Sequence, residues 1–365
     1  MERRLIIDAL AFEYGKAYGY QEYLFNLLEY FYANRSEILF EKVDVICLEK
    51  QKCYFQKYAD KFGIKTYKCS LIIQRLLVQT LMPFLLKLHK EDLILYTANY
   101  SSLLKKSRHL LVIHDLLFKK KLFFPYYLMR MQRELYLPIS IKLADKIIAI
   151  SNFTASDIVR YYPNCKNKIL VIYNYFNFSK FPKVNDEVRK EDYFISVCSS
   201  AYHKNTITLL KAFETYCMNG GTYKLVLVGG IQNGTDLYFQ YLKLPVNIRE
   251  RIQFYHKITN EQLALLYQKA RAYISASLFE GLGMPIVEAM YFDLPVLLSD
   301  YPVFHEVSLN KGLYFDPLNY EALSKRMKQI SERSMNPDSY SDMVLERYSE
   351  ENTSAKYIQI INSLF

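Results

Sequence analysis

Residues 277–290 read Ser277-Leu-Phe-Glu-Gly-Leu-Gly-Met-Pro-Ile-Val-Glu-Ala-Met290 and place two carboxylates and two glycines around a predicted helix start. Residues 272–277 are predicted to form a strand, and Pro285 suits the first position of a helix. Glycines let backbone amides approach a ligand closely, and amides at a helix start bind anions. The positions concerned are Glu280, Gly281, Gly283 and Glu288. Because carboxylates accept hydrogen bonds from hydroxyl groups, the stretch predicts a ligand with phosphate and hydroxyls, such as a nucleotide sugar.

Strand-like and helix-like runs alternate on both sides of this stretch, which predicts parallel sheets with helices on their faces. The predicted strands are residues 5–10, 43–48, 93–97, 110–115, 146–151, 168–174, 193–198, 223–228, 251–255, 272–277, 295–299 and 312–315. Since 365 residues exceed one ordinary core, we expect an α/β fold of two Rossmann-like domains with a catalytic cleft between them. The expected parts are a domain at 1–178, a linker at 179–192, a nucleotide-sugar-binding domain at 193–348, and a helix at 349–365 that packs back on the first domain.

Several predicted strands of the first half end on polar residues, namely Asp8, His114, Asp115, Ser151 and Asn174. Ligands of open α/β sheets lie beyond the carboxyl ends of the strands. These side chains are therefore candidates for a binding site. Taken alone, His114 is equally explained as a hydrogen-bonded core histidine.

The composition limits the class of protein. The six cysteines have no metal-ligand spacing, and no secretory signal or membrane-spanning run is recognised, which favours a cytoplasmic protein with reduced thiols. Residues 1–180 hold 28 Lys and Arg against 16 Asp and Glu, whereas residues 181–365 hold 19 against 21. A basic first half attracts anionic lipid headgroups, a diphosphate-bearing acceptor or nucleic acid, and charge alone does not choose among them.

The spacing of the two glutamates, Glu280-Gly-Leu-Gly-Met-Pro-Ile-Val-Glu288, resembles the hallmark of the GT-B glycosyltransferases of the large retaining family 4, in its mannosyltransferase-like branch. The resemblance continues through Asp293-Leu-Pro-Val296, His305-Glu-Val307 and Gly312-Leu-Tyr-Phe-Asp-Pro317. It also covers residues 193–205 and, more weakly, the first half. It therefore implies a GT-B architecture and a glycosyltransferase activity.

The resemblance also implies roles for individual residues. Glu288 is expected to bind the donor ribose, and Glu280 the hydroxyls of the donor sugar. Lys204 is expected to hold the donor diphosphate, with Ser199 where relatives often have an arginine. The backbone of Gly281, Leu282, Gly283 and Met284 is expected to line the sugar and diphosphate, and Gly19, in the loop at residues 15–19, to approach the donor. His114 is expected beside the donor sugar, so His114, Glu280 and Lys204 are the candidates for catalysis. Taken alone, Lys204 is equally explained as a solvated lysine.

We therefore expect retaining transfer of a hexose from GDP-mannose or a UDP-sugar to a hydroxyl of a glycan acceptor, linked to polyprenyl diphosphate, in the assembly of cell-surface polysaccharide. No cofactor and no metal are expected. The alternatives are a sugar-nucleotide epimerase or a phosphorylase on the same scaffold, an inactive relative, and, more remotely, a nucleic-acid-binding protein. Cations and aromatic residues alternate at 119–127, which is either a solvated basic face or a surface for peripheral contact with an anionic membrane.

Overall fold

The computed structural model describes residues 2–15, 18–69, 72–120, 127–183, 188–332 and 339–365. The chain divides into two compact units: Met1–Tyr175 together with Tyr348–Phe365, and Phe176–Arg347. The first division thus lies three residues before the expected domain end. The described part of the expected linker at 179–192 belongs to the second unit, where Gln268 donates a hydrogen bond to the carbonyl of Pro182.

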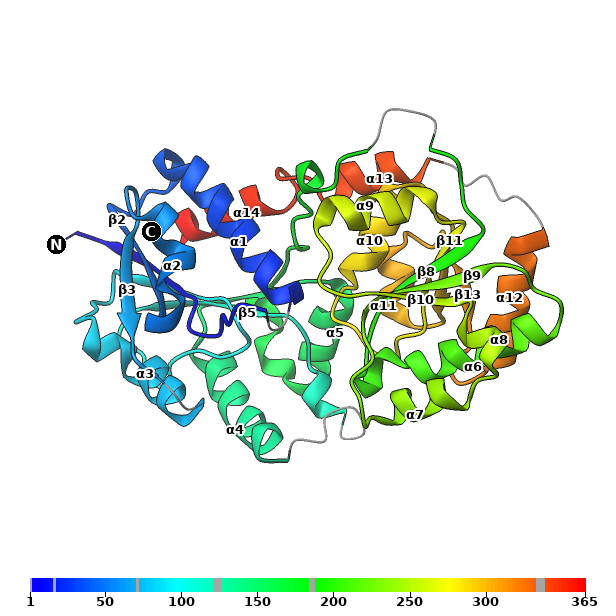
Figure 1. Cartoon of the computed structure of the whole chain (residues 1–365). Helices are drawn as coiled ribbons and strands as arrows, with labels where there is room; N and C mark the ends of the chain where they lie inside the picture. Colours follow the sequence, from blue (N-terminus) through cyan, green and yellow to red (C-terminus); the bar gives the residue numbers. More distant parts are fainter. Residues whose placement is uncertain (1, 16–17, 70–71, 121–126, 184–187, 333–338) are drawn as a thin grey trace. The chain divides into compact units, whose positions relative to one another are not determined.

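The first unit is built on a parallel sheet of seven strands among the described residues, in the order β3-β2-β1-β4-β5-β6-β7. The strands are β1 Arg4–Asp8, β2 Lys42–Leu48, β3 Gly63–Tyr67, β4 Leu93–Tyr96, β5 Arg108–Ile113, β6 Lys146–Ala149 and β7 Ile169–Val171. The helices are α1 Tyr18–Ala33, α2 Lys52–Phe55, α3 Ile72–Leu85, α4 Tyr127–Leu143, α5 Asn152–Tyr161 and α14 Ser354–Ser363. Helices α1 and α14 lie on one face of the sheet, and α3 and α4 on the other (Figure 1).

Strand β3 was not predicted from the sequence. It lies at the edge of the sheet, and all five of its residues are only partly buried, so its sequence lacks the apolar run of a buried strand. Strand β2 ends at Leu48 as predicted, and the remaining strands of this unit end one to three residues earlier than predicted. The polar residues His114, Ser151 and Asn174 therefore lie just beyond the strands, in the loops that follow them.

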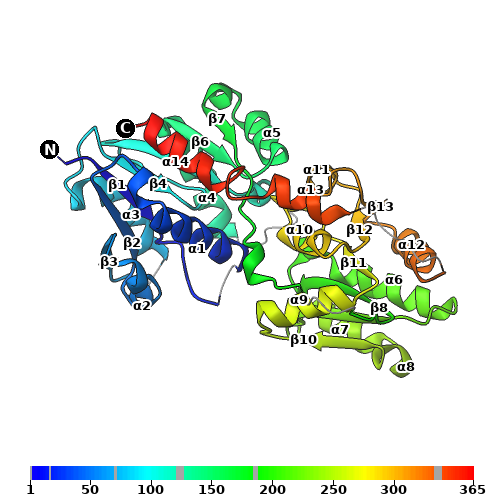
Figure 2. The ribbon, with the colours of Figure 1, turned by 90° about the horizontal axis from the view of Figure 1, so that it is seen from above.

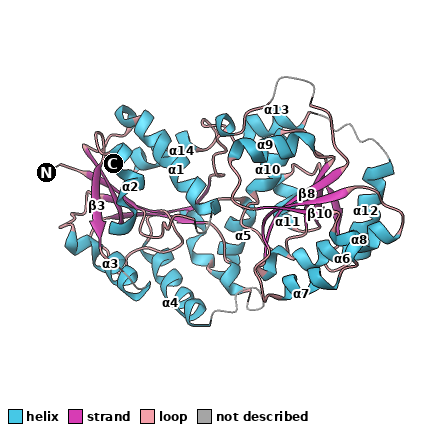
Figure 3. Ribbon diagram, viewed as in Figure 1, coloured by secondary structure: helices cyan, strands magenta, loops and turns pink. Residues whose placement is uncertain are grey.

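The second unit has a parallel sheet of six described strands in the order β10-β9-β8-β11-β12-β13. The strands of this unit are drawn in magenta among its cyan helices in Figure 3. The strands are β8 Tyr193–Ser199, β9 Lys224–Gly230, β10 Ile252–Tyr255, β11 Ala272–Ser275, β12 Val296–Ser299 and β13 Leu313–Phe315. The helices are α6 Thr206–Met218, α7 Asp236–Lys243, α8 Val246–Arg249, α9 Asn260–Lys269, α10 Met284–Tyr291, α11 Pro302–Val307, α12 Tyr320–Glu332 and α13 Tyr340–Arg347.

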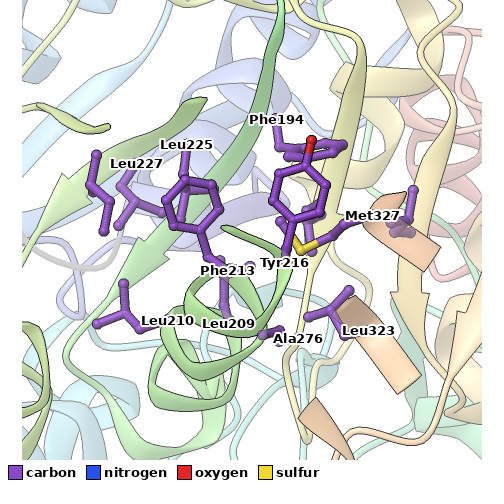
Figure 4. Close-up of a cluster of buried hydrophobic side chains, with 14 of the residues drawn as sticks. Phe194, Leu209, Leu210, Phe213, Tyr216, Leu225, Leu227, Ala276, Leu323 and Met327 are labelled. Atoms are coloured by element: carbon purple, nitrogen blue, oxygen red, sulfur yellow. The ribbon is translucent and has the colours of Figure 1, made fainter. Parts of the chain in front are cut away.

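The core of the second unit explains why these segments fold as they do. Apolar residues of α6, such as Leu209 and Phe213, recur at helical spacing and pack under β8 and β9 beside Met327 of α12 (Figure 4). Ser199 at the end of β8 and the loop after β11 lie at the point where strand order reverses. This is where open α/β sheets bind ligands.

Candidate functional site

Lys204 and Glu280 come from two loops of the second unit that are joined through the backbone. The short 3-10 helix Tyr202–Lys204 follows β8, and the loop after β11 is tied to it by a hydrogen bond from the Leu278 amide to the His203 carbonyl, 2.7 Å long. Asn205, in the left-handed region at φ +51°, donates to the carbonyl of Pro317 at 2.8 Å. The backbone on both sides of Lys204 is therefore fixed.

The side chains of Lys204 and Glu280 form an ion pair, with Nζ 2.6 Å from Oε1. Burial by itself would raise the pKa of Glu280, but the charge and hydrogen bond of Lys204 outweigh it, so the pKa lies below its ordinary value. Glu280 is thus ionised at neutral pH and only accepts hydrogen bonds. This state suits the binding of hydroxyl groups and does not suit a general acid.

Helix α10 begins beside this ion pair. Its N-cap is Gly283 at φ +96°, a conformation that residues with a Cβ rarely adopt, and a Cβ there would lie 3.2 Å from Ile286. Pro285 is the second residue of the helix, one position later than the sequence predicted. The first amides of a helix have no acceptor within it, so the backbone at Gly283 and Met284 presents donors to an anion. The side chain of Leu282 is buried, so only its backbone faces a ligand.

Glu288 lies one turn further along α10 and is half-buried. Tyr267 of α9 donates a hydrogen bond from its hydroxyl to Glu288 Oε2 at 2.9 Å. Burial raises the pKa of Tyr267 well above its ordinary value, and the nearby carboxylate of Glu288 raises it further. The phenol therefore keeps its proton and remains a donor. Sequence reasoning missed this tyrosine, because nothing in its local pattern distinguishes it from a core residue.

Ser199, one of the residues expected to bind the donor, ends β8. Its hydroxyl oxygen accepts a hydrogen bond from the Ala201 amide at 3.3 Å, and its carbonyl accepts one from Thr206 at 3.1 Å. The hydroxyl hydrogen of Ser199 remains a possible donor to a ligand. The structure therefore brings together three side chains and a helix start in loops that follow the carboxyl ends of β8 and β11. They are Ser199, Lys204, Glu280 and the start of α10.

His114 belongs to the first unit and directly follows β5. Its amide donates to Asn99 Oδ1 at 2.7 Å, and its Nε2 lies 2.8 Å from the carbonyl oxygen of Thr97. Tyr20 and Tyr23 of α1 pack edge-on against its ring. Burial lowers the pKa of His114, against the opposing effects of the Thr97 carbonyl and Asp115, so the ring is neutral at pH 7. Because a carbonyl only accepts, Nε2 carries the proton and Nδ1 is left as an acceptor.

Two further predictions fall partly outside the described residues. In the loop at residues 15–19, positions 16 and 17 lie outside them, whereas Gly19 lies in the first turn of α1. In the basic run at 119–127, positions 121–126 lie outside them. Lys119 contacts aromatic rings, with Nζ 5.4 Å from the ring centroid of Tyr162.

Residues 177–346 match the model of the family described as glycosyl transferases group 1. The match covers nearly all of the second unit, and together with the relatives it shows that the chain is a glycosyltransferase. It is 28% identical over 249 residues to the O-antigen chain mannosyltransferase RfbU of Salmonella typhimurium, covering 68% of this chain and 67% of that protein. It is 34% identical over 139 residues to the serotype-specific mannosyltransferase WbdA of Escherichia coli, covering 38% of this chain but only 17% of that protein.

The fold is likewise that of known glycosyltransferases. The structure of HepE of Anabaena in complex with UDP and glucose has a TM-score of 0.72 to this chain, at 14% identity, with 99% and 98% of the two chains covered. The predicted α/β fold with GT-B architecture is therefore confirmed. Epimerase, phosphorylase and nucleic-acid-binding functions receive no support from these relatives.

Within the described residues, no group of three or more His, Cys, Asp or Glu side chains is arranged to hold a metal ion. No described helix is both long and apolar enough to cross a bilayer.

Proposed function

We propose that this glycosyltransferase transfers a hexose from a nucleotide-diphosphate sugar to a glycan hydroxyl, with retention of the anomeric configuration. The observation that carries this is the Lys204–Glu280 ion pair beside the start of α10, with Glu288 one turn away. A cation, free amides and two carboxylates together match the phosphates and hydroxyls of such a donor.

Lys204 and the amides at Gly283 and Met284 stabilise the negative charge that develops on the departing diphosphate. The ammonium group of Lys204 has three donors, so it binds a phosphate oxygen while it keeps Glu280 in place. Charge stabilisation by such preorganised donors is usually the largest single contribution to catalysis, about 10²- to 10³-fold per donor. The proton of the acceptor hydroxyl then passes to the departing phosphate, on the same face of the sugar.

Glu280 and His114 hold the sugar rather than exchange protons with it. Glu280 is ionised and accepts hydrogen bonds from sugar hydroxyls, and the neutral His114 ring offers Nδ1 for the same purpose. Glu288, oriented by Tyr267, binds the ribose hydroxyls. No cofactor or metal is part of this proposal.

The relatives favour mannose as the transferred sugar, because RfbU and WbdA are both named mannosyltransferases. RfbU is further named for the O-antigen chain, which supports an acceptor glycan in cell-surface polysaccharide. We propose GDP-mannose as the first donor to test, UDP-sugars as the second, and a polyprenyl-diphosphate-linked glycan at the cytoplasmic face of the membrane as the acceptor.

The test is to incubate the purified chain with GDP-mannose or UDP-sugars and a synthetic lipid-diphosphate-linked oligosaccharide. Released nucleotide diphosphate is quantified, and the new linkage is assigned by NMR. We expect an α-linked product from one donor, and a loss of about 10²-fold or more in kcat/KM for Lys204→Ala. An inverted linkage, or wild-type turnover in Lys204→Ala, would contradict the proposal.

A further inference from the structure

The hydroxyl of Thr97 ties the residue that follows β4 to the end of β1. Thr97 is completely buried, and its Oγ1 donates a hydrogen bond to the carbonyl oxygen of Asp8, the last residue of β1, at 2.5 Å. Because a carbonyl only accepts, this bond uses the single hydrogen of the Thr97 hydroxyl. Toward any other hydroxyl group, Thr97 Oγ1 therefore acts as an acceptor.

Tyr20, in the first turn of α1, supplies such a hydroxyl group. Its phenol oxygen lies 2.7 Å from Thr97 Oγ1, and since Thr97 has no second hydrogen to give, Tyr20 is the donor. The hydrogen bonds thus run in one direction, from Tyr20 through Thr97 to the carbonyl of Asp8. We call these three residues the Tyr20–Thr97–Asp8 chain.

The accepting end of the Tyr20–Thr97–Asp8 chain is itself fixed. Strand β1 lies inside the sheet, between β2 and β4. The carboxylate of Asp8 accepts hydrogen bonds from the Leu10 amide at 3.0 Å and from the side-chain amide of Gln79 of α3 at 2.8 Å. Thr97 is therefore held between the sheet on one side and α1 on the other.

The carbonyl of Thr97 decides which nitrogen of His114 carries the proton. It lies 2.8 Å from Nε2, and the proton of a neutral imidazole is placed by the hydrogen bond that one of its two nitrogens makes. Strand β4 ends at Tyr96, one residue before Thr97, so this carbonyl lies beyond the strand. Its direction therefore depends on what holds the side chain of Thr97.

Tyr20 contacts both the histidine and the residue that places its proton. The ring of Tyr20 packs edge-on against His114 with the ring centroids 5.7 Å apart, while its hydroxyl is bonded to Thr97. His114 itself is partly exposed, so a ligand can reach its ring. The Tyr20–Thr97–Asp8 chain thus lies directly behind a side chain that faces a ligand.

We propose that Thr97 and Tyr20 are positioning residues, which hold the Thr97 carbonyl against Nε2 of His114 and so keep Nδ1 as an acceptor for a hydroxyl of the donor sugar. The inference deepens the proposed function and rests on it for the identity of the ligand at Nδ1. A role in packing alone fits less well, because a buried hydroxyl costs free energy unless it is bonded, and an apolar side chain of the same size avoids that cost.

The first measurement is nuclear magnetic resonance of the full chain with histidine labelled with nitrogen-15, in which the two ring nitrogens show which one is protonated. Signals of His114 are assigned by their loss in His114→Gln. We expect wild type to carry the proton on Nε2 at neutral pH. Thr97→Val and Tyr20→Phe should each add a population with the proton on Nδ1, and Thr97→Ser, which restores the hydroxyl, should return the wild-type spectrum.

The second measurement is turnover with GDP-mannose and a lipid-diphosphate-linked acceptor. We expect kcat/KM to fall about tenfold in Thr97→Val and in Tyr20→Phe, the loss that one hydrogen bond to the sugar accounts for, and to recover in Thr97→Ser. Monodeoxy forms of GDP-mannose locate the hydroxyl concerned. With the form that lacks it, the two variants should lose nothing further relative to wild type, because the bond that they weaken is already absent.

The matched controls are Ser308→Ala and Tyr314→Phe in the second unit. The same kind of hydrogen-bonded chain is present there, since the buried Ser308 hydroxyl donates to the Phe304 carbonyl at 2.5 Å and lies 2.7 Å from the hydroxyl of Tyr314. Both controls should leave the His114 signals and kcat/KM at wild-type values.

The two measurements separate this inference from the proposed function. A His114 protonated only on Nε2 in both Thr97→Val and Tyr20→Phe would overturn the inference, and so would wild-type turnover in both variants. Absence of turnover in wild type with every sugar donor would instead contradict the proposed function. In that case a changed tautomer in the variants would still support the positions assigned to Thr97 and Tyr20.

Discussion

At the scale of single residues, the Lys204–Glu280 pair makes the sharpest prediction. Glu280→Gln keeps the shape of the side chain but removes the charge that accepts from sugar hydroxyls and orients Lys204. We expect kcat/KM to fall about 10²- to 10³-fold. The free energy of unfolding should fall by only about 1–3 kcal/mol, because the pair is mostly buried but the introduced amide oxygen still accepts a hydrogen bond from Lys204.

The control for this substitution is Glu332→Gln, at an exposed carboxylate of α12 in the same unit. It should leave both turnover and stability at wild-type values. If Glu280→Gln retained full turnover, the carboxylate would be assigned a structural role only.

Tyr267 is predicted to act through Glu288 rather than on the donor itself. Tyr267→Phe removes only the hydroxyl that donates to Glu288 Oε2, so the ribose-binding carboxylate loses its orientation. We expect the donor KM to rise about tenfold with kcat nearly unchanged, since loss of a hydrogen bond to a charged group costs about 1.5–3 kcal/mol. Steady-state kinetics with varied donor measures this. A tenfold fall in kcat with an unchanged donor KM would contradict a positioning role.

At the scale of elements, the last residues of β9 depend on one glycine. Gly229 has φ +121°, and a Cβ there would lie 2.0 Å from the backbone carbonyl oxygen of Cys198 in β8. Gly229→Ala should therefore push β8 and β9 apart at the ends that lead to Ser199. We expect a loss of about 3 kcal/mol or more in the free energy of unfolding.

Gly220→Ala is the matched control, because Gly220 also has a positive φ, but a Cβ there would meet no atom within 4 Å. It should cost only the backbone strain, about 1 kcal/mol. Urea denaturation followed by circular dichroism compares the two. Similar losses in both variants would show that contact with Cys198 is unimportant.

The elements and their order were largely predictable from the sequence, whereas the contacts between them were not. Buried strands such as β2 and β9 read as apolar runs, and Gly283 and Pro285 mark the start of α10. Strand β3 escaped prediction because its sequence includes Lys65 and Thr66, whereas the other edge strand, β7, is an apolar run. Two hydrogen bonds join residues that are far apart in the sequence, one from Tyr267 to Glu288 and one from Gln79 to Asp8. Local periodicity does not indicate such pairs, because folding brings their members together.

At the scale of the whole molecule, the chain returns to its first unit after completing the second. Helix α14 lies beside α1 (Figure 2), and the hydroxyls of Tyr357 and Tyr23 are 3.0 Å apart. The ring of Tyr23 in turn packs edge-on against His114, with the ring centroids 4.7 Å apart. Arg108 of β5 also donates to the carbonyl of the last residue, Phe365, at 2.9 Å. The C-terminal helix therefore supports Tyr23 of α1, the residue that packs against His114.

Tyr357→Ala should open a cavity beneath α1 and destabilise the first unit by about 3–5 kcal/mol, while Tyr357→Phe, which loses only the hydroxyl contact, should cost about 1 kcal/mol. Hydrogen exchange followed by mass spectrometry resolves the two units. In Tyr357→Ala we expect faster exchange in α1 and in the strands of the first sheet, with the second unit unchanged. The control Phe239→Ala, at an exposed ring of α7, should change hydrogen exchange in neither unit. Unchanged protection of α1 in Tyr357→Ala would mean that α14 does not support His114, whereas a parallel loss in the second unit would mean that the two units unfold together.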